Sequence, residues 1–346
     1  MRHIGLDVHK RDTKLCWIYD DTGEISGRAT VMTSEVIATI QALPGERCVV
    51  LEVGAQSWFL ARALMSLPQT QVWVVDAFRA RRALEGMRRG TKTDKVDAEG
   101  LARLSLEGRA AAMAVWLADP LTHQLRTVSH TRLTLVRQAT ALQNQIRALL
   151  QAEGVTCRSA DLMGRKGQQE LALLTPTLAP VAAECLIQLR DSLRFVKQQV
   201  QVIEQRLTQL VQAHPNGPRL MTIGGCGVVL AGLIIGEIGQ ITRFSHARHL
   251  RSYAGLTPRI CQSGARSQLG PLTPGNRNLK YGLVMLAQHF AWSQHFDQTR
   301  LKRTYYRCLN RYGPNPAKVA LARHLCDIIF AMLRDQTDFA PEVLAA

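Results

Sequence analysis

The first hundred residues carry four carboxylates at positions where a metal-dependent reaction would need them. Asp7 ends an apolar run in the sequence G-L-D-V-H-K, and Glu52 lies near the end of another in V-V-L-E-V-G. An ionised carboxylate beside an apolar run is costly unless a cation or hydrogen-bond donors compensate it. Asp94 and Asp97 are three residues apart at a predicted helix start, which places both on one face. Together the four acids predict oxygen ligands for one or two Mg²⁺ ions.

Each acid also has a structural interpretation that involves no metal. An aspartate at a strand end is commonly a turn former, and Glu52 can pair with an arginine. Asp94 can cap the helix while Asp97 in the first turn favours its dipole. The elements that position the four acids decide between these interpretations.

The first domain alternates strand and helix signals. Apolar alternation and continuous apolar runs predict strands over residues 3–8, 14–19, 24–32, 47–53 and 71–75. Helices are predicted from Ser34, as a cap, to about residue 43, and from 57 to 67. The resulting order, β-β-β-α-β-α-β-α, predicts a mixed sheet. Two strand-end acids followed by a helical D-x-x-D match the layout of an RNase H-like nuclease core, which favours metal-assisted phosphoryl transfer.

Long helices are predicted from about residue 120 onwards. Apolar residues recur at intervals of three and four over 135–149, and they do so without exception over 186–210. This spacing predicts a heptad seam. With a weakly patterned stretch at 153–180 between them, the two helices predict an antiparallel coiled-coil arm with an irregular tip, and both intramolecular pairing and dimerisation remain open. Residues 215–218, P-N-G-P, predict a linker. The expected domains are an acidic catalytic domain at 1–115, the arm at 116–214 and a basic, mostly helical domain at 219–335.

The net charge of the 346-residue chain is concentrated in its last third. The chain has 43 basic and 27 acidic residues, a formal charge of +16. Residues 1–100 contribute +1, residues 101–210 contribute +5 and residues 211–346 contribute +10. A solvated surface spreads its charge, whereas a binding face concentrates it, so the pattern predicts a polyanion partner for the C-terminal third.

The composition excludes several other classes of protein. At 46% hydrophobic and 20% charged residues, the chain is neither disordered nor fibrous. No apolar run is long enough to cross a bilayer and no signal peptide is recognisable, which predicts a soluble, unexported protein without a membrane partner. The eight cysteines include no C-x-x-C pair, so they are expected to be reduced thiols rather than disulfides or zinc ligands.

Two further patterns in the C-terminal third could carry chemistry. Gly224, Gly225 and Gly227 precede an apolar helix, an arrangement that points backbone N–H groups at a phosphate in helix-hairpin-helix elements. Ser263 is expected in a flexible polar loop between Arg259 and Arg266, where a serine could attack a phosphodiester while the arginines stabilise the developing charge. A glycine-rich turn between packed helices and a plain Ser-Gly turn are the structural alternatives. Tyr305 and Tyr306, among several arginines, are rival nucleophiles on which a tyrosine-recombinase interpretation rests.

These residues together resemble the DEDD transposases of the insertion-sequence family one-ten, the Piv-like, bridge-RNA-guided recombinases. The resemblance covers nearly the whole chain. It rests most on two long motifs, T-K-T-D-K-V-D-A around Asp94 and Asp97, and F-x-x-A-x-x-L-x-x-Y-A-G-L-T-P-R followed by Ser263 and by G-N-x-x-L-K ending at Lys280.

The resemblance implies a RuvC-like N-terminal domain whose four acids hold Mg²⁺, and a transposase domain with an essential serine. It further implies that Ser263 forms a covalent phosphoserine linkage to double-stranded donor or target DNA, with the acidic site supplied by another protomer of a dimer or tetramer. A structured non-coding guide RNA would pair with both DNAs while the protein holds the backbone. Arg277 and Lys280 would contact phosphate, and the protein would act in the bacterial cytoplasm, on the nucleoid when bound to DNA.

Two other functions remain open at this level. A RuvC-like junction-resolving nuclease would use the same acids to activate water and would form no covalent intermediate. A non-catalytic nucleic-acid-binding assembly protein would depend on the coiled coil and the basic domain alone, and would leave the four acids without a role.

Overall fold

The chain is described by a computed structural model that covers the backbone of residues 1–85, 94–263, 266–293 and 299–340. Side chains are described for the same residues except 85, 94–96, 260–263 and 266–269. The chain divides into two compact units, Met1–Leu117 and Ala118–Ala346. The division into three domains therefore stays a prediction.

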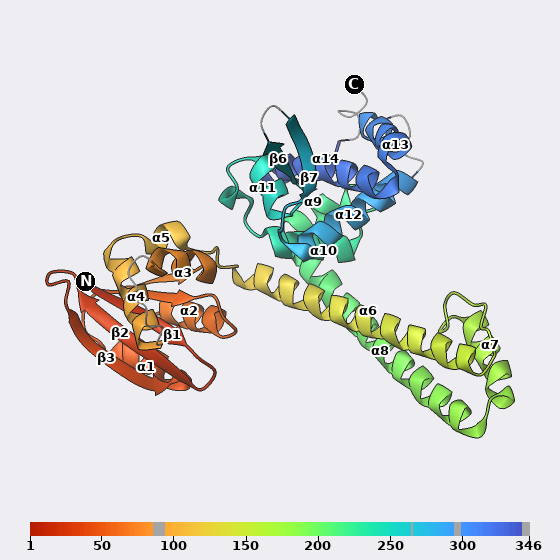
Figure 1. Ribbon diagram of the computed structural model, residues 1–346, viewed down its shortest axis with the longest axis horizontal. Coiled ribbons are helices and arrows are strands. Elements are labelled where there is room, and N and C mark those ends of the chain that lie inside the picture. The colour runs from red at the N-terminus through yellow and green to blue at the C-terminus, as the bar shows by residue number, and fades with distance from the viewer. Residues whose placement is uncertain (86–93, 264–265, 294–298, 341–346) are drawn as a thin grey trace. The chain divides into compact units, whose positions relative to one another are not determined.

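The N-terminal unit is built on a five-stranded mixed sheet (Figure 1). Its strands are β1 (Arg2–Val8), β2 (Asp12–Tyr19), β3 (Ile25–Met32), β4 (Arg47–Glu52) and β5 (Thr70–Val75). Their spatial order is β3-β2-β1-β4-β5. The first three strands form an antiparallel meander, whereas β4 pairs in parallel with both β1 and β5. The predicted strands and the mixed sheet are confirmed.

Helices cover both faces of this sheet. The elements are a 3₁₀ turn η1 (Thr33–Glu35), α1 (Val36–Ala42), α2 (Ser57–Met65), α3 (Ala77–Glu85), α4 (Asp94–Leu106) and α5 (Ala110–Met113). Because the pleat sends alternate side chains to opposite faces, Leu6 and Leu51 pack with α1 and α2. Val50 and Val75 pack on the other face with α3, α4 and α5. The inner strand β4 and the edge strand β5 are thus both covered on their two faces, as their continuous apolar runs predict.

The predicted helix cap at Ser34 is wrong. Ser34 lies inside η1, and the residue that precedes α1 is Glu35, which makes no side-chain cap. The neighbouring Thr33 explains the difference, because its buried hydroxyl donates to the His9 carbonyl oxygen at 3.0 Å and also lies 3.0 Å from the Thr13 hydroxyl. This anchoring pulls the chain into a tight turn before the helix starts.

Two long antiparallel helices, α6 (Pro120–Ala152) and α8 (Pro180–Ala213), begin the C-terminal unit (Figure 1). Leu186 and Leu193 of the heptad seam are buried against α6, where they join a cluster with Ile146. At the other end of the pair, Arg132 Nε donates to Glu204 Oε1 at 2.7 Å. The predicted helices and the buried face of the second one are confirmed.

The tip between these helices is more regular than the sequence pattern predicts. It contains α7 (Arg165–Leu174) and a 3₁₀ turn, η2 (Thr175–Thr177). Leu171 of α7 is fully buried against the α6–α8 pair, which explains why a short helix is stable there. Hydrogen bonds from the Ser159 side chain and from nearby backbone amides lower the pKa of Glu170 to about 2, and so tie α7 to the preceding loop.

The remaining elements of this unit include a buried helix, α10, which packs against α6, α8, α9 and α12. They are α9 (Asn216–Met221), α10 (Val228–Ile238), a 3₁₀ turn η3 (Ile241–Arg243), α11 (Ala247–Tyr253), β6 (Pro258–Ser263), β7 (Arg266–Leu272), α12 (Arg277–Trp292), α13 (Arg300–Tyr312) and α14 (Pro314–Asp335). Every α10 residue from Leu230 to Ile238 is buried. The predicted basic, mostly helical region is present, with one hairpin added.

Two local predictions in this region are wrong. Residues 215–218 form no linker, because α9 begins at Asn216 and the Gly217 amide donates to the His214 carbonyl oxygen at 2.8 Å, making a tight corner after α8. The expected polar loop around Ser263 is an antiparallel hairpin of β6 and β7.

Two predictions from composition can be compared with the structure. The cysteines that the structure describes are free thiols, as expected. Within the described parts of the chain, no helix combines the length and the apolar character needed to cross a membrane.

Candidate functional site

The ends of β1 and β4 bring Asp7 and Glu52 to neighbouring positions. Leu6 is paired with Leu51 in the parallel ladder, and each acid is the next residue of its strand. Both acids therefore share the face that also carries Val50, opposite the face of Leu6 and Leu51. Both side chains are only partly buried, so they border solvent at the edge of the sheet.

Helix α4 is held against this same face at Gly5. A Cβ atom added to Gly5 would overlap the Ala98 carbonyl oxygen and crowd the Ala102 nitrogen, so only glycine permits this approach. Since Gly5 and Asp7 lie on the same side of β1, the helix reaches the sheet beside Asp7. Asp97 directly precedes the contact residue Ala98, and Asp94 is the first residue of the helix, as predicted. The Asp94 side chain lies outside the described residues.

The surroundings of Asp7 include groups that the sequence analysis did not single out. His9 Nε2 lies 3.1 Å from Asp7 Oδ2, and Lys14 stands opposite Asp7 in the antiparallel ladder with β2. The loop after β1 is also tied to the loop after β4, because Gln56 Nε2 donates to the Lys10 carbonyl oxygen at 3.1 Å. The D-x-H spacing of Asp7 and His9 is a signal that could have indicated the contact.

The donor chemistry at this edge fits a hard divalent cation. Asp7, Glu52 and Asp97 offer carboxylate oxygens, which Mg²⁺ prefers. Among the side chains that the structure describes, no group of three or more potential metal ligands is assembled. Asp7, Glu52 and Asp97 therefore do not form such a group by themselves, and Asp94 is not among the described side chains, so the four-acid site stays a prediction.

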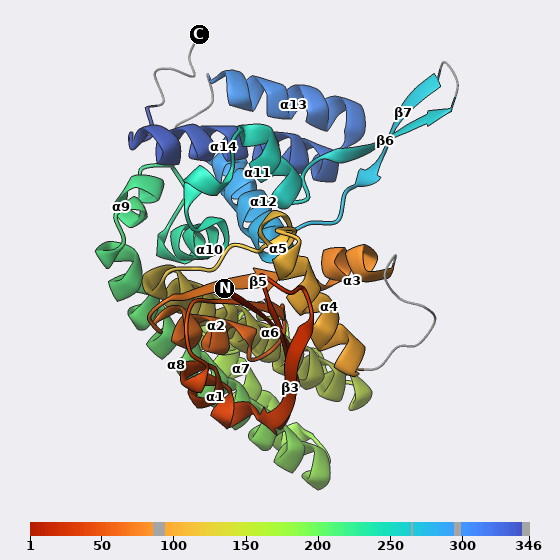
Figure 2. The same ribbon diagram turned by 90° about the vertical axis from the view of Figure 1, so that its left-hand side faces the viewer.

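Ser263 and the arginines predicted around it belong to the β6–β7 hairpin. Ser263 is the last residue of β6 and is paired with Arg266, the first residue of β7. Arg259 near the start of β6 is exposed. Figure 2 shows the hairpin projecting away from the helices of the C-terminal unit. Its backbone thus places Ser263 and Arg266 side by side at the outer end, while the side chains of both residues lie outside the described set.

At the base of the hairpin the two segments of the long C-terminal motif, 244–259 and 275–280, contact each other. The backbone N–H of Asn276 donates to the Tyr253 carbonyl oxygen at 2.7 Å, and the backbone N–H of Thr273 donates to the Thr257 carbonyl oxygen at 2.8 Å. Gly275 lies against Gly255 so closely that an added Cβ would overlap the Gly255 backbone. The Asn276 side chain also caps α12, accepting from the Leu279 amide at 2.9 Å. The two motif segments therefore form one rigid base for the hairpin.

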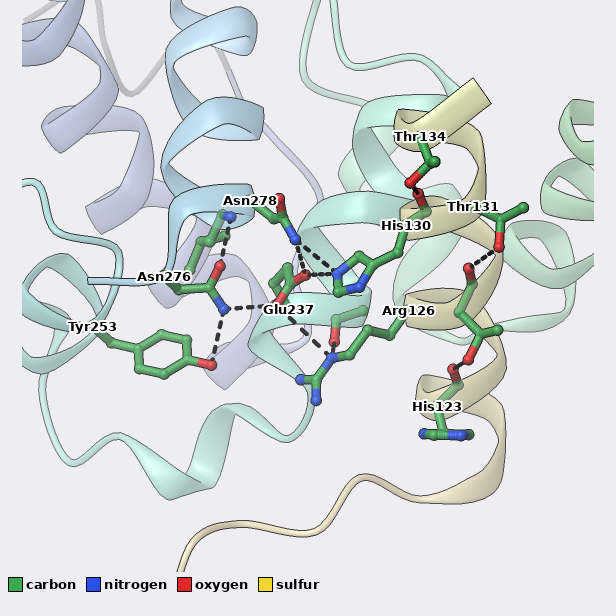
Figure 3. Close-up of polar contacts among 12 residues, drawn as sticks. His123, Arg126, His130, Thr131, Thr134, Glu237, Tyr253, Asn276 and Asn278 are labelled. Atoms are coloured by element: carbon green, nitrogen blue, oxygen red, sulfur yellow. Dashed lines mark hydrogen bonds and ion pairs between the residues drawn. The ribbon is translucent and has the colours of Figure 1, made fainter. Parts of the chain in front are cut away.

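A buried carboxylate, Glu237, contacts this base through the Asn276 side chain, as Figure 3 shows. Glu237 of α10 has only 4% of its side chain exposed. Asn276 Nδ2 donates to its Oε2 at 2.6 Å, while Oε1 contacts His130 Nε2 of α6. Asn278 Nδ2 lies within hydrogen-bond reach of both His130 and Glu237, and Arg126 Nε lies 3.8 Å from Glu237 Oε2.

The polar partners of Glu237 keep it ionised despite its burial. Burial alone raises the pKa of this carboxyl group, but hydrogen bonds from His130 and Asn276 and the charge of Arg126 outweigh it and lower the pKa overall. Glu237 is not among the site residues that the sequence patterns predict. The signal was present, because Glu237 is the only charged residue in the apolar run 228–238, and a carboxylate there needs partners.

Replacing Glu237 by Gln is expected to lower the free energy of unfolding by about 1–3 kcal/mol at pH 7, because the buried donors lose a charged acceptor. The lowered pKa means that the carboxylate stabilises the fold above its unfolded value of 4.5, and that this contribution is lost as the pH falls through the folded value. The difference between wild type and variant should therefore shrink below about pH 4.5. Urea denaturation from pH 7 to pH 4 measures it.

Glu204→Gln serves as the matched control. Glu204 pairs with Arg132 but is 37% exposed, so its replacement should cost at most about 1 kcal/mol. Equal losses in the two variants would contradict a special role for the buried carboxylate.

The predicted glycine turn, Gly224 to Gly227, lies near the opposite end of α12 from the hairpin base. The Gly225 carbonyl oxygen contacts His289 Nδ1 at 3.2 Å, near the C-terminal end of α12. Arg277, at the start of the same helix, is twelve residues away, or about 18 Å along the axis. A cleft at the turn is lined by Gly225, Gly227, Arg132 and Tyr281, among others. Arg277, next to the hairpin base, is therefore distant from the Gly225–His289 contact, whereas the residue after Lys280, Tyr281, lines the cleft at the turn.

The two tyrosines proposed as rival nucleophiles differ in exposure. Tyr305 is 8% exposed and belongs to the C-terminal core, whereas Tyr306 is 47% exposed on α13. Burial removes Tyr305 from contact with a DNA strand.

Two family models match the chain in the two regions just described. One, of the DEDD transposases of the IS110 type and described as a transposase, matches residues 4–153, which include Asp7, Glu52, Asp94 and Asp97. The other, described as a transposase of the IS116/IS110/IS902 family, matches residues 217–306, which include the hairpin and its base.

Individual relatives agree with these matches. The transposase for insertion sequence element IS1111A of Coxiella burnetii is 27% identical over 97% of this chain and 90% of its own length. A protein of insertion element IS110 from Streptomyces coelicolor is 29% identical over 71% of each chain. The pilin gene-inverting protein of Moraxella bovis is 26% identical over 43% of this chain and 48% of its own. The chain therefore belongs to the IS110 family of transposases and is a DNA-modifying enzyme of the transposase and recombinase class.

Proposed function

We propose that this transposase cuts and joins DNA strands with a carboxylate site in its N-terminal unit and a serine nucleophile in its C-terminal unit, directed by a structured guide RNA. The observation that supports the proposal is that Asp7 and Glu52 lie at adjacent strand ends, on the face where Gly5 admits helix α4, which begins at Asp94.

The four acids would hold Mg²⁺ through their carboxylate oxygens. When bound, Mg²⁺ neutralises charge on the phosphate oxygens and stabilises the developing transition state. The protein's contribution is to hold Asp7 and Glu52 at a fixed separation on paired strands and to hold Asp97 on a helix packed against them. His9, whose Nε2 lies 3.1 Å from Asp7 Oδ2, would orient the Asp7 carboxylate, and Lys14, opposite Asp7 in the ladder, would offset its charge.

Ser263 would act as the nucleophile. Its hydroxyl oxygen attacks the phosphorus of a DNA phosphodiester, a serine–phosphate bond forms, and one backbone P–O bond breaks. The released sugar oxygen takes up the proton that the serine hydroxyl loses, so that the step balances. Arg266, paired with Ser263 in the hairpin, and Arg259 would stabilise charge on the phosphate. Arg277 and Lys280, in the first turn of α12, would hold neighbouring phosphates.

Guide RNA would supply most of the sequence specificity. The basic excess of the C-terminal third supports backbone binding, which carries little sequence information by itself. We further propose that α6 and α8 act as a coiled-coil arm, that Gly224, Gly225 and Gly227 form a helix-hairpin-helix-like phosphate contact, and that the active protein is a dimer or tetramer.

Reconstitution tests this proposal. The full-length protein is incubated with donor DNA, target DNA, the non-coding RNA of its own element, and Mg²⁺. A joined product is expected only when all components are present, with loss of product after RNA omission or chelation by EDTA. Equal product without the RNA would reject RNA guidance, and equal product in EDTA would reject the metal-dependent step.

A further inference from the structure

Helix α13 presents a continuous basic and aromatic face to solvent. Arg303, Tyr306, Arg307, Asn310 and Arg311 are all exposed, and their spacing of three and four residues places them on one side of the helix. We call these five residues the α13 surface.

The opposite side of α13 fixes the helix to the core. Leu301, Lys302 and Tyr305 are buried. Lys302 donates from Nζ to the Ser293 carbonyl oxygen, and the Thr299 side chain caps the helix. The α13 surface is therefore held on a rigid element, and its charges do not serve the packing of the helix.

The charges on the α13 surface are unfavourable for an isolated helix. Arg303, Arg307 and Arg311 follow one another at intervals of four residues, where like charges repel by about 0.2–0.5 kcal/mol per pair. The first turn contains no acidic residue, although the helix dipole favours negative charge there. None of the three arginines forms an ion pair with an acidic side chain that the structure describes. A bound polyanion would remove this repulsion.

Tyr306 adds a second kind of contact to the surface. It is 47% exposed, and the buried ring of Tyr305 packs edge to face against it at 5.5 Å between ring centroids. The Tyr306 ring is thus supported on one side and open on the other. Arginines interleaved with an exposed aromatic ring are typical of surfaces that hold phosphates while a base stacks on the ring.

We propose that the α13 surface binds unpaired nucleotides, with Tyr306 stacking on a base and Arg303, Arg307 and Arg311 contacting the adjacent phosphates. Unpaired bases are required because paired bases in a duplex are stacked on both faces and offer none to a tyrosine. The inference rests on the proposed nucleic-acid function of the chain. An RNA loop and a melted DNA strand both supply this chemistry.

Binding of short oligonucleotides to the full-length protein tests the inference. Fluorescence anisotropy would compare a single-stranded RNA, a single-stranded DNA of the same sequence, and the DNA duplex. Tyr306→Ala is expected to weaken binding of the single strands by about five-fold or more while duplex affinity stays within two-fold. Tyr306→Phe should keep wild-type affinity because the ring remains. The double variant R303A/R307A should weaken single-strand binding further and flatten its salt dependence.

Matched variants on α8 control for general effects. Phe195→Ala removes another exposed aromatic ring, and R194A/R206A removes two exposed arginines, so neither should lower single-strand affinity as the α13 variants do. If Tyr306→Ala loses more affinity for single-stranded RNA than for single-stranded DNA, the ligand is an RNA loop. If it loses more affinity for single-stranded DNA, the ligand is a DNA strand. Unchanged single-strand binding in Tyr306→Ala, or an equal loss for duplex, would overturn the inference. The assay needs no catalysis, so its result is independent of whether strand joining occurs.

Discussion

Replacing Asp7 by Asn is expected to lower the rate of DNA strand cleavage by at least about 10³-fold. The amide has nearly the same shape as the carboxylate, so β1 and its contact with α4 should be preserved. It lacks the negative charge needed to hold a divalent cation next to Glu52, where the parallel ladder places the two acids on one face. Cleavage of an end-labelled donor DNA at saturating Mg²⁺ measures the effect.

Asp21→Asn is the matched control for Asp7→Asn. Asp21 is exposed in the turn between β2 and β3, and its replacement by Asn removes one negative charge just as Asp7→Asn does. The Asp21→Asn variant should cleave at the wild-type rate. Melting temperature and DNA affinity should be unchanged in both variants. Cleavage by Asp7→Asn within a few-fold of wild type would show that Asp7 takes no part in catalysis, and that the catalytic groups lie elsewhere in the chain.

Replacing Ser263 by Ala is expected to abolish any covalent protein–DNA adduct and the joined product. The hydroxyl oxygen is the atom that would bond to phosphorus, and alanine leaves the end of β6 without a nucleophile. Denaturing gels of labelled DNA, with and without protease treatment, detect the adduct. Ser267→Ala is the control, because Ser267 lies in the same hairpin, opposite Gln262, and its variant should form the adduct normally.

Two results would contradict the assignment of the serine. An adduct that persists in Ser263→Ala would move the nucleophile to another residue. Cleaved ends without an adduct in the wild-type protein would favour the junction-resolving nuclease, in which the same acids activate water.

The acids of the N-terminal unit illustrate what local pattern alone can predict. Asp7 and Glu52 each follow an uninterrupted apolar run, and such runs form strands because their side chains must be buried on both faces. Asp94 and Asp97 stand at a helix start that the spacing indicates directly. These features depend on neighbours a few residues away, so they are readable in the sequence.

The hairpin and its support show where local pattern is insufficient. The residues from Pro258 to Leu272 show little apolar alternation, so the sequence pattern does not indicate the two strands that pair there. Glu237 acquires its role from His130, 107 residues earlier, and from Asn276, 39 residues later. No spacing rule connects residues so far apart.

The sequence by itself determined the strands of the N-terminal unit, the long helices, the positions of the four acids along the chain and the concentration of charge in the C-terminal third, because each follows from side-chain type and short-range periodicity. The tertiary structure decided which of these features meet. The parallel register places Asp7 beside Glu52, the bare backbone of Gly5 admits α4 to the same face, and the buried Glu237 joins α6, α10 and α12 beneath the hairpin. These outcomes depend on close packing between distant segments, which the order of residues along the chain does not display.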